Sequence, residues 1–183
     1  MENKLLLICA PSGTGKSTVA RMLTITDNRF KHVQVLTTRK LREEEKGKFE
    51  KVQVTLTDLE EMNRKGELVN FNEKDGTHYG IRYCSIKSLL AKNVFPVLEW
   101  DINNLNYWDD KFPVYKVILE PMSIEYVLEN LNDGRDADGK RKRGVIQETE
   151  KIKSGIFKGD KLIINFEGTL FDTVQKIRNA LLG

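Results

Sequence analysis

Long apolar runs, cysteine and proline are all scarce in this chain. The longest apolar run covers residues 5–10, far fewer than the ~20 residues that a helix needs to cross a bilayer. Pro-Ser-Gly follows this run directly, which is too early for the apolar core of a secretory signal. We therefore expect no membrane segment, no membrane partner and no export. The four prolines form no linker, so we expect one domain spanning residues 1–183.

Cysteine is too rare for a disulfide framework. Cys9 and Cys84 are the only two, and neither has a cysteine or histidine neighbour at the spacing of a metal site. A reducing, cytoplasmic compartment is therefore expected. A large excess of one charge is also missing, because 30 Lys and Arg face 27 Asp and Glu, for a net charge of +3. That balance predicts no nucleic-acid partner, although residues 31–51 carry a local basic excess.

Aliphatic stretches, by contrast, recur along the whole length. Five of them look like buried strands, at residues 4–9, 33–36, 97–101, 114–119 and 161–165. Helical patterns lie between them: residues 57–60 form a capping box, and Ser85 and Ser123 are candidate N-caps. The last helix has apolar residues at 170, 174, 177 and 181, which form one face. This alternation predicts an α/β fold in which helices cover both faces of a parallel sheet.

Two polar, charged stretches interrupt the alternation, at residues 40–51 and 132–143. Both are poor in large apolar residues, so we expect exposed loops or lids. A plain solvated surface is the alternative interpretation of such runs.

The most specific motif follows the first strand and precedes a helical pattern. It reads Ala10-Pro11-Ser12-Gly13-Thr14-Gly15-Lys16-Ser17-Thr18. A strand, a glycine-rich loop and a helix in this order are the context of a phosphate-binding P-loop, although alanine stands where the first glycine is usual. The alternative is a glycine-rich turn that binds no ligand.

The residue types in this motif suit the binding of a nucleoside triphosphate. Gly13 and Gly15 let backbone N–H groups turn toward phosphates where a Cβ would obstruct the approach. Lys16 can reach the β- and γ-phosphates, and the Ser17 hydroxyl can ligate Mg²⁺. We therefore expect residues 12–18 to bind ATP with its Mg²⁺. The motif alone leaves an ATPase, a GTPase, a kinase and a nucleotide-regulated module open.

Three further motifs narrow the choice. They are Thr37-Thr38-Arg39-x-x-Arg42-x-x-Glu45, Tyr79-Gly80 and, at the end of a strand, Glu99-x-Asp101. Together with the P-loop, and in this order, they resemble the guanylate kinases over essentially the whole chain. The resemblance implies a P-loop NTPase fold with a core at residues 1–36 and 84–183. It also implies a small acceptor-binding insert at about 37–83 and a lid at about 132–143.

The same resemblance assigns an acceptor site. It implies that Arg39, Arg42 and the Tyr79 hydroxyl bind the acceptor phosphate, and planar guanidinium groups are well suited to bidentate phosphate contacts. The alternative is that these arginines pair with the glutamates at 43–45 on the surface.

Acidic and amide side chains complete the implied acceptor site. Glu45 and Asn70 belong to it by resemblance, and Asp101 lies near the acceptor base. Glu99 is implied to orient Mg²⁺-bound water or a group on the P-loop side. Two solvated acids at the end of a strand are the alternative for Glu99 and Asp101.

The basic segment at 132–143 corresponds to the lid. By resemblance Arg135 and Arg143 reach the transferring phosphoryl group, where cations stabilise the charge of the transition state. The basic run at residues 140–143 could instead be a nuclear-localisation or nucleic-acid patch, but its place between two predicted helices favours the lid. Asn165 corresponds to a family position near the donor nucleotide.

Departures from the family pattern cluster at the acceptor base. Val35 stands where these kinases have a serine, Asn70 where a glutamate reads the guanine edge, and Ile81 where a hydroxyl residue follows Tyr-Gly. A tyrosine expected after Glu45 and an arginine expected before Arg135 are also missing. Unmatched buried polar groups are costly, so we expect weaker guanine recognition. An asparagine amide both donates and accepts, so it could pair with another or a modified base.

These motifs predict a nucleoside monophosphate kinase that moves the γ-phosphoryl group of ATP to GMP or dGMP. Lys16, Arg135 and Arg143 are the expected catalytic residues, and Mg²⁺ is the expected cofactor. A kinase of the same fold that acts on another or modified (deoxy)nucleoside monophosphate is the first alternative. A noncatalytic binding module is the second, and the intact P-loop argues against it. We expect nucleotides as partners of a monomer or homodimer.

Overall fold

The computed structural model describes residues 3–131, 139–166 and 168–183. The chain forms two compact units. The first consists of residues 29–96 with the N-terminal residues 1–3, and the second of residues 4–28 and 97–183. The predicted bounds of the acceptor-binding insert stay a prediction.

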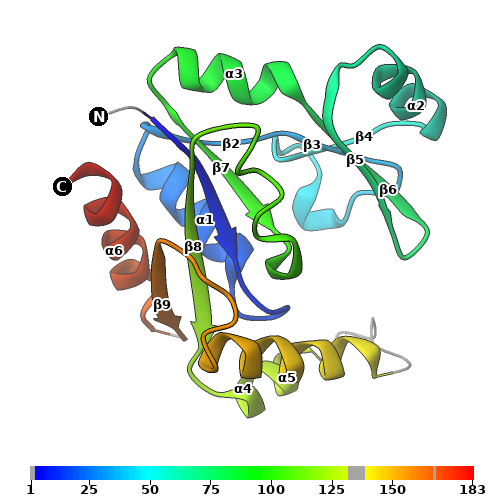
Figure 1. Cartoon of the computed structure of the whole chain (residues 1–183). Coiled ribbons are helices and arrows are strands. Elements are labelled where there is room, and N and C mark those ends of the chain that lie inside the picture. The colour runs from blue at the N-terminus through cyan, green and yellow to red at the C-terminus, as the bar shows by residue number, and fades with distance from the viewer. Residues whose placement is uncertain (1–2, 132–138, 167) are drawn as a thin grey trace. The chain divides into compact units, whose positions relative to one another are not determined.

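A parallel sheet forms the centre of the second unit. Its strands are β1 (Leu5–Cys9), β7 (Phe95–Trp100), β8 (Val114–Pro121) and β9 (Lys161–Asn165). With β2 (Phe30–His32) at one edge, the larger sheet has the order β2-β7-β1-β8-β9, and β1 pairs in parallel with β7 and β8 (Figure 1). All of β1 and residues 117–119 of β8 are buried, so both faces of these strands are covered. The predicted α/β fold is confirmed.

Helices surround this sheet. They are α1 (Lys16–Thr26), α4 (Ile124–Asn130), α5 (Lys140–Lys153) and α6 (Leu170–Leu182). A 3₁₀ turn, Ile102–Asn104, follows β7. α6 packs against α1 and β9 with Val174, Ile177 and Leu181 buried as predicted. Arg178 of α6 pairs with the buried Asp27 at 3.0 Å. None of the described helices is both long and apolar enough to span a membrane.

The first unit contains a smaller sheet that the sequence patterns did not predict. Its strands are β3 (Val35–Thr37), β4 (Lys51–Gln53), β5 (Leu68–Lys74) and β6 (Thr77–Arg82), in the order β4-β3-β6-β5. α2 (Leu56–Arg64) contacts β5 and β6, and α3 (Tyr83–Ala91) contacts β6. A 3₁₀ turn covers Glu43–Glu45. Asp75 and Gly76, both with positive φ, form the β5–β6 turn, a sequence typical of a tight hairpin.

Several predicted element bounds were wrong. Of the predicted strand at 33–36, only residues 35–36 lie in a strand, β3, which belongs to the smaller sheet, and β2 (Phe30–His32) ends before the predicted strand begins. The capping box of α2 is made by Thr55 and Asp58, because these two side chains reach each other's backbone N–H. α3 begins at Tyr83, and Ser85 donates to the carbonyl of Arg82 instead of capping. Ser123 does cap α4, through the backbone N–H of Tyr126.

Gly80 of β6 allows α2 to lie close to the smaller sheet, and we expect Gly80→Ala to destabilise the protein. The new methyl group would lie 2.7 Å from Cδ2 of Leu59 and 3.1 Å from Cδ1 of Leu68. Because Leu59 is fully buried, its side chain cannot turn aside. The free energy of unfolding should fall by about 1–3 kcal/mol in urea titrations.

Gly144→Ala is the matched control for that change. Gly144 lies inside α5, and a methyl group there would meet no atom within 4 Å. The same substitution should therefore raise the free energy of unfolding by about 0.5–1 kcal/mol. Equal unfolding midpoints for Gly80→Ala and the wild type would contradict the packing argument.

Candidate functional site: a phosphate loop and an arginine–glutamate network

The loop between β1 and α1 has the backbone of an anion cradle. Gly13 and Gly15 adopt φ values of 81° and 92°, which residues with a Cβ rarely adopt. A Cβ at Gly13 would also lie 3.0 Å from Val127. Gly15 is the N-cap of α1 and offers no side-chain cap. The first N–H groups of α1 thus donate to no capping side chain, and such groups bind phosphates in other helices.

Lys16 turns back over this loop. Its Nζ donates to the carbonyl oxygen of Ala10 and, at 3.1 Å, to that of Pro11. Burial lowers the pKa of the Lys16 ammonium, while the carboxylates of Glu99, Glu148 and Asp101 act in the opposite direction. The ammonium is therefore held where the loop backbone curves, with acidic groups nearby.

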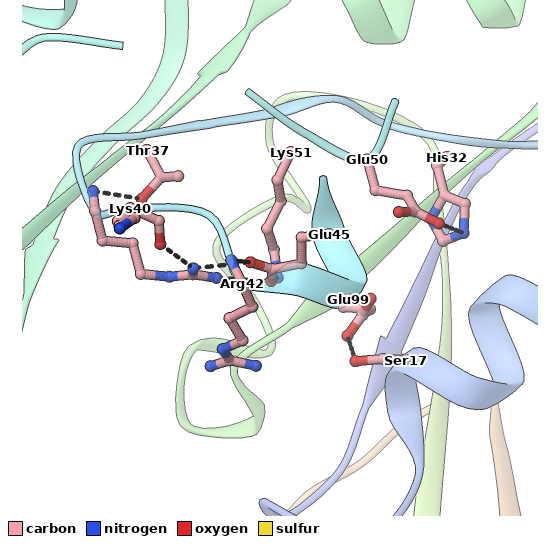
Figure 2. A network of polar contacts seen from close by, with 10 residues as sticks. Ser17, His32, Thr37, Lys40, Arg42, Glu45, Glu50, Lys51 and Glu99 are labelled. Atoms are coloured by element: carbon pink, nitrogen blue, oxygen red, sulfur yellow. Dashed lines mark hydrogen bonds and ion pairs between the residues drawn. The ribbon is translucent and has the colours of Figure 1, made fainter. Parts of the chain in front are cut away.

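The Ser17 hydroxyl meets a carboxylate from the end of β7. Ser17 Oγ donates to Oε2 of Glu99 at 2.5 Å, a contact drawn in Figure 2. Hydroxyl and carboxylate oxygens are the hard donors that Mg²⁺ prefers, and Mg²⁺ in nucleotide sites takes most other ligands from phosphates and water. Among the described residues no three acidic, histidine or cysteine side chains form a closed metal cluster. The two oxygen donors of Ser17 and Glu99 fit a nucleotide-bound Mg²⁺ by their chemistry.

Two side chains from distant elements fasten the loop. Asn165, at the end of β9, donates from Nδ2 to the carbonyl of Thr14 at 2.7 Å and accepts from the Thr173 hydroxyl. Arg141 of α5 donates from Nε to Oγ of Ser12 at 2.8 Å. Three predicted nucleotide-site residues, Ser12, Thr14 and Asn165, thus take part in contacts that hold this loop. Thr18 is exposed in the first turns of α1.

Residues 140–143 form the first turn of α5, so the end of the predicted lid segment is helical and not a loop. The residue that contacts the phosphate loop is Arg141. Arg143 is exposed, because residues two apart in a helix point about 200° from each other. Most of the predicted lid, with Arg135, lies outside the described residues.

Asp101 is held by residues that no sequence motif indicated. Asn103 Nδ2 donates to Oδ1 of Asp101 at 3.2 Å and to Oε1 of Glu148, on α5, at 2.7 Å. The backbone N–H of Asn103 also donates to Asp101. Glu148 therefore acts on two predicted site residues, on Asp101 through Asn103 and on Lys16 through its charge. Its position 45 residues after Asn103 gives no sequence signal.

In the first unit, Arg39 and Glu45 form a bidentate ion pair. Arg39 Nη1 and Nη2 donate to the two carboxylate oxygens of Glu45 at 2.8 and 2.7 Å. Lys51 donates to Oε1 at 2.7 Å and the backbone N–H of Arg42 to Oε2 at 3.0 Å. We call these four residues the Glu45 network. The Arg42 side chain extends away from it (Figure 2). In this structure Arg39 thus forms the alternative contact, a pair with a neighbouring glutamate.

Tyr79 lies beside the same guanidinium. Hydrogen bonds to Glu45 raise the pKa of Arg39, and a hydrogen bond to the Tyr79 hydroxyl acts in the same direction. Tyr79 is paired across the sheet with Thr37 of β3 and Asn72 of β5. The structure therefore brings together Arg39, Glu45 and Tyr79, which the motifs had placed in one site.

The Glu45 carboxylate should make stability depend on pH. Burial alone would raise the pKa of Glu45, but hydrogen bonds from Arg39, Lys51 and the Arg42 backbone lower it far below its ordinary value of 4.5. The folded state thus binds this proton more weakly than the unfolded state. Stability from this group is present above about pH 4.5 and is lost as the pH falls toward the folded pKa. Glu45→Gln should therefore flatten the acid limb of the stability–pH curve.

Urea titrations at neutral pH and at about pH 3 measure that difference. Glu43→Gln is the control, because Glu43 is 85% exposed and pairs only with the exposed Lys46 among the ion pairs that the structure describes. Such surface pairs contribute little to stability. A wild-type acid limb in Glu45→Gln would contradict the assignment.

Comparison with known proteins agrees with this geometry. A family model described as guanylate kinase matches residues 2–181. The guanylate kinase of Bdellovibrio bacteriovorus is 27% identical over 138 residues, which cover 74% of this chain and 75% of that protein. The guanylate kinase of Chlorobium luteolum is 26% identical over 180 residues, 97% of this chain and 90% of that protein.

A solved structure shows the same fold. The crystal structure of guanylate kinase from Anaplasma phagocytophilum matches with a TM-score of 0.74 and 21% identity, over 98% of this chain and 84% of that one. Since the family model spans nearly the whole sequence and the fold agrees, this chain belongs to the guanylate kinase family.

Proposed function

We propose that this chain transfers the γ-phosphoryl group of ATP to GMP or dGMP, giving the nucleoside diphosphate and ADP. The observation that carries the proposal is the phosphate loop, where Lys16, Ser17, Asn165 and Arg141 meet one glycine-rich turn. A binding module without catalysis needs no such assembly. Family membership supports the same reaction.

On the donor side, residues 12–18 would bind the phosphates of ATP. The N–H groups at the start of α1 face anionic oxygens, and Lys16 would place its charge on the β- and γ-phosphates. Thr14 Oγ1 is buried and has no hydrogen-bond partner among the described residues. A ligand oxygen at this loop would satisfy it. Asn165, which fixes the Thr14 carbonyl, would support the loop near the donor nucleotide.

Mg²⁺ is the cofactor that this donor set fits. Ser17 would hold it, with Glu99 oriented toward the same hydroxyl. When bound, the ion neutralises charge on the phosphate oxygens.

On the acceptor side, Arg39, Arg42 and Tyr79 would hold the dianionic phosphate of the monophosphate. Glu45 would act through Arg39, because its carboxylate fixes the guanidinium and would itself repel phosphate. Asn70 and Asp101 would face the acceptor base. Phosphoryl transfer needs little covalent chemistry from the protein, so positioning and charge supply most of the rate.

The remaining assignments follow from the family resemblance. Arg135 and Arg143 would stabilise the transferring phosphoryl group as lid arginines. We expect a monomer or homodimer in the cytoplasm, with nucleotides as partners and neither nucleic acid nor membrane bound.

ADP formation from ATP, measured with each ribo- and deoxynucleoside monophosphate in turn, tests the proposal. Turnover with GMP or dGMP supports it. ATP binding without turnover of any acceptor would contradict it and favour a noncatalytic module.

A further inference from the structure

The residues that depart from the family pattern at the acceptor base form one row across the smaller sheet. Val35 of β3 is paired with Ile81 of β6, and Ile81 is paired on its other side with Asn70 of β5. Paired residues in antiparallel strands point to the same face. The neighbouring row, Thr37–Tyr79–Asn72, lies on this face as well. The row Val35–Ile81–Asn70 therefore adjoins Tyr79, which contacts Arg39 of the Glu45 network.

A β-bulge places Asn70 on this face. Leu68 is paired with Arg82 and Asn70 with Ile81, so β5 has one residue more than β6 at this point. Without the extra residue, Asn70 would be paired with Gly80 and would lie on the opposite face of the sheet. That face is covered by α2, because a Cβ at Gly80 would contact Leu59 of this helix. Bulges beside functional sites commonly re-aim a side chain in this way.

Asn70 is a largely buried residue whose amide forms no hydrogen bond within the part of the chain that the structure describes. Only 6% of Asn70 is exposed, and Ile81 beside it is 2% exposed. Its side chain makes no hydrogen bond to any other residue that the structure describes. Since matched hydrogen bonds to a largely buried polar group are favourable, a ligand with a complementary edge would gain affinity there. An amide presents one donor and one acceptor side by side.

This pairing capacity does not require the 2-amino group of guanine. With guanine or hypoxanthine, the amide can donate to O6 and accept from N1–H. When the amide group is rotated by about 180° around its χ2 bond, it can donate to N1 of adenine and accept from the N6 amino group. A carboxylate only accepts hydrogen bonds. Among these three bases it would therefore match only guanine, which has two adjacent donors, N1–H and the 2-amino group. Val35 and Ile81 offer no polar atom to a 2-amino group.

We propose that the row Val35–Ile81–Asn70 recognises the acceptor base without contacting a 2-amino group. Purine monophosphates that lack this group, IMP and AMP, are therefore acceptors alongside GMP. This inference rests on the proposed kinase activity. Asn70 is the residue that determines which acceptor bases are bound. Its apolar neighbours Val35 and Ile81 have no polar group that a base without the 2-amino group would leave unpaired.

Steady-state kcat/KM for GMP, IMP and AMP, with ATP as donor, tests this directly. We expect the three values to lie within about tenfold of one another, because each of these bases presents an edge that pairs with both groups of the Asn70 amide. Asn70→Glu should raise the GMP:AMP ratio by about 100-fold or more, since a carboxylate faces the N1 lone pair of adenine unfavourably.

Asn72→Glu is the matched control. Asn72 lies two residues further along β5 on the same face but is exposed, so the same substitution should leave the GMP:AMP ratio within about twofold. The wild-type ratios carry the test even if Asn70→Glu fails to fold, which thermal melting would reveal.

The possible failures can be told apart. A preference for GMP over both IMP and AMP of about 1,000-fold or more would overturn this inference and leave the kinase proposal standing. An unchanged GMP:AMP ratio in a folded Asn70→Glu variant would also overturn it. No turnover with any monophosphate would overturn the kinase proposal itself, and the inference with it.

Discussion

Lys16→Ala should reduce the rate of ADP formation by about 10²–10³-fold or more, because removing one preorganised cation or donor from developing phosphoryl charge typically costs that much. The ammonium lies against the Ala10 and Pro11 carbonyls of the phosphate loop, and it would exchange these contacts for phosphate oxygens when ATP binds. The loss should be seen in kcat at saturating ATP and acceptor. Coupled detection of ADP measures it.

Lys92→Ala is the control for this variant. Lys92 is exposed at the C-terminal end of α3, and its loss should leave kcat unchanged. Thermal melting of both variants separates a catalytic loss from misfolding. An unaltered kcat in Lys16→Ala would show that the phosphate loop does not act on the reacting group.

Arg39→Ala should lower kcat/KM for the acceptor by about 10²-fold or more and leave the KM for ATP unchanged. The variant loses a planar fork that can contact two phosphate oxygens at once. Arg39→Lys keeps the charge without the fork and should fall between the wild type and Arg39→Ala. Kinetics with each substrate varied in turn provide the measurement.

Arg64→Ala supplies the comparison within the same unit. Arg64 lies exposed in the last turn of α2, so its removal should affect neither KM. Since Arg39→Ala also deprives the buried Glu45 of two hydrogen bonds, urea unfolding must accompany the kinetics. An equal rise in both KM values would indicate general disruption and would refute a role at the acceptor phosphate.

Sequence patterns predicted the second unit better than the first. β1, β8 and β9 are aliphatic strands that alternate with helices, and the burial of β1 and of residues 117–119 of β8 on both faces gives a strong pattern. β4, β5 and β6 carry many polar residues and are short or half-exposed, so no aliphatic run marks them. The Asp75-Gly76 turn was the one local signal that could have revealed the β5–β6 hairpin.

The contacts of the site show a similar limit. The glycine-rich loop was predictable, because its backbone requires particular residues at fixed spacing. The sequence offered the Arg39–Glu45 pair only as one of several pairings with the glutamates at 43–45, because a loop and a 3₁₀ turn separate the two residues and no helical or strand period selects one glutamate. Arg141 and Glu148 contact Ser12 and Asn103 through the packing of α5, and tertiary packing of that kind leaves no mark in a local motif.

The bidentate ion pair between Arg39 and Glu45 has a consequence for the entropy of acceptor binding. An arginine side chain that is free in solution loses rotamer freedom when it grips a ligand, at a cost of about 0.5–1.5 kcal/mol. Here the long side chain is ordered before any acceptor arrives, because Glu45 holds both of its terminal nitrogens. The cost of ordering is thus met during folding, and the arriving phosphate meets a cation that is already immobile.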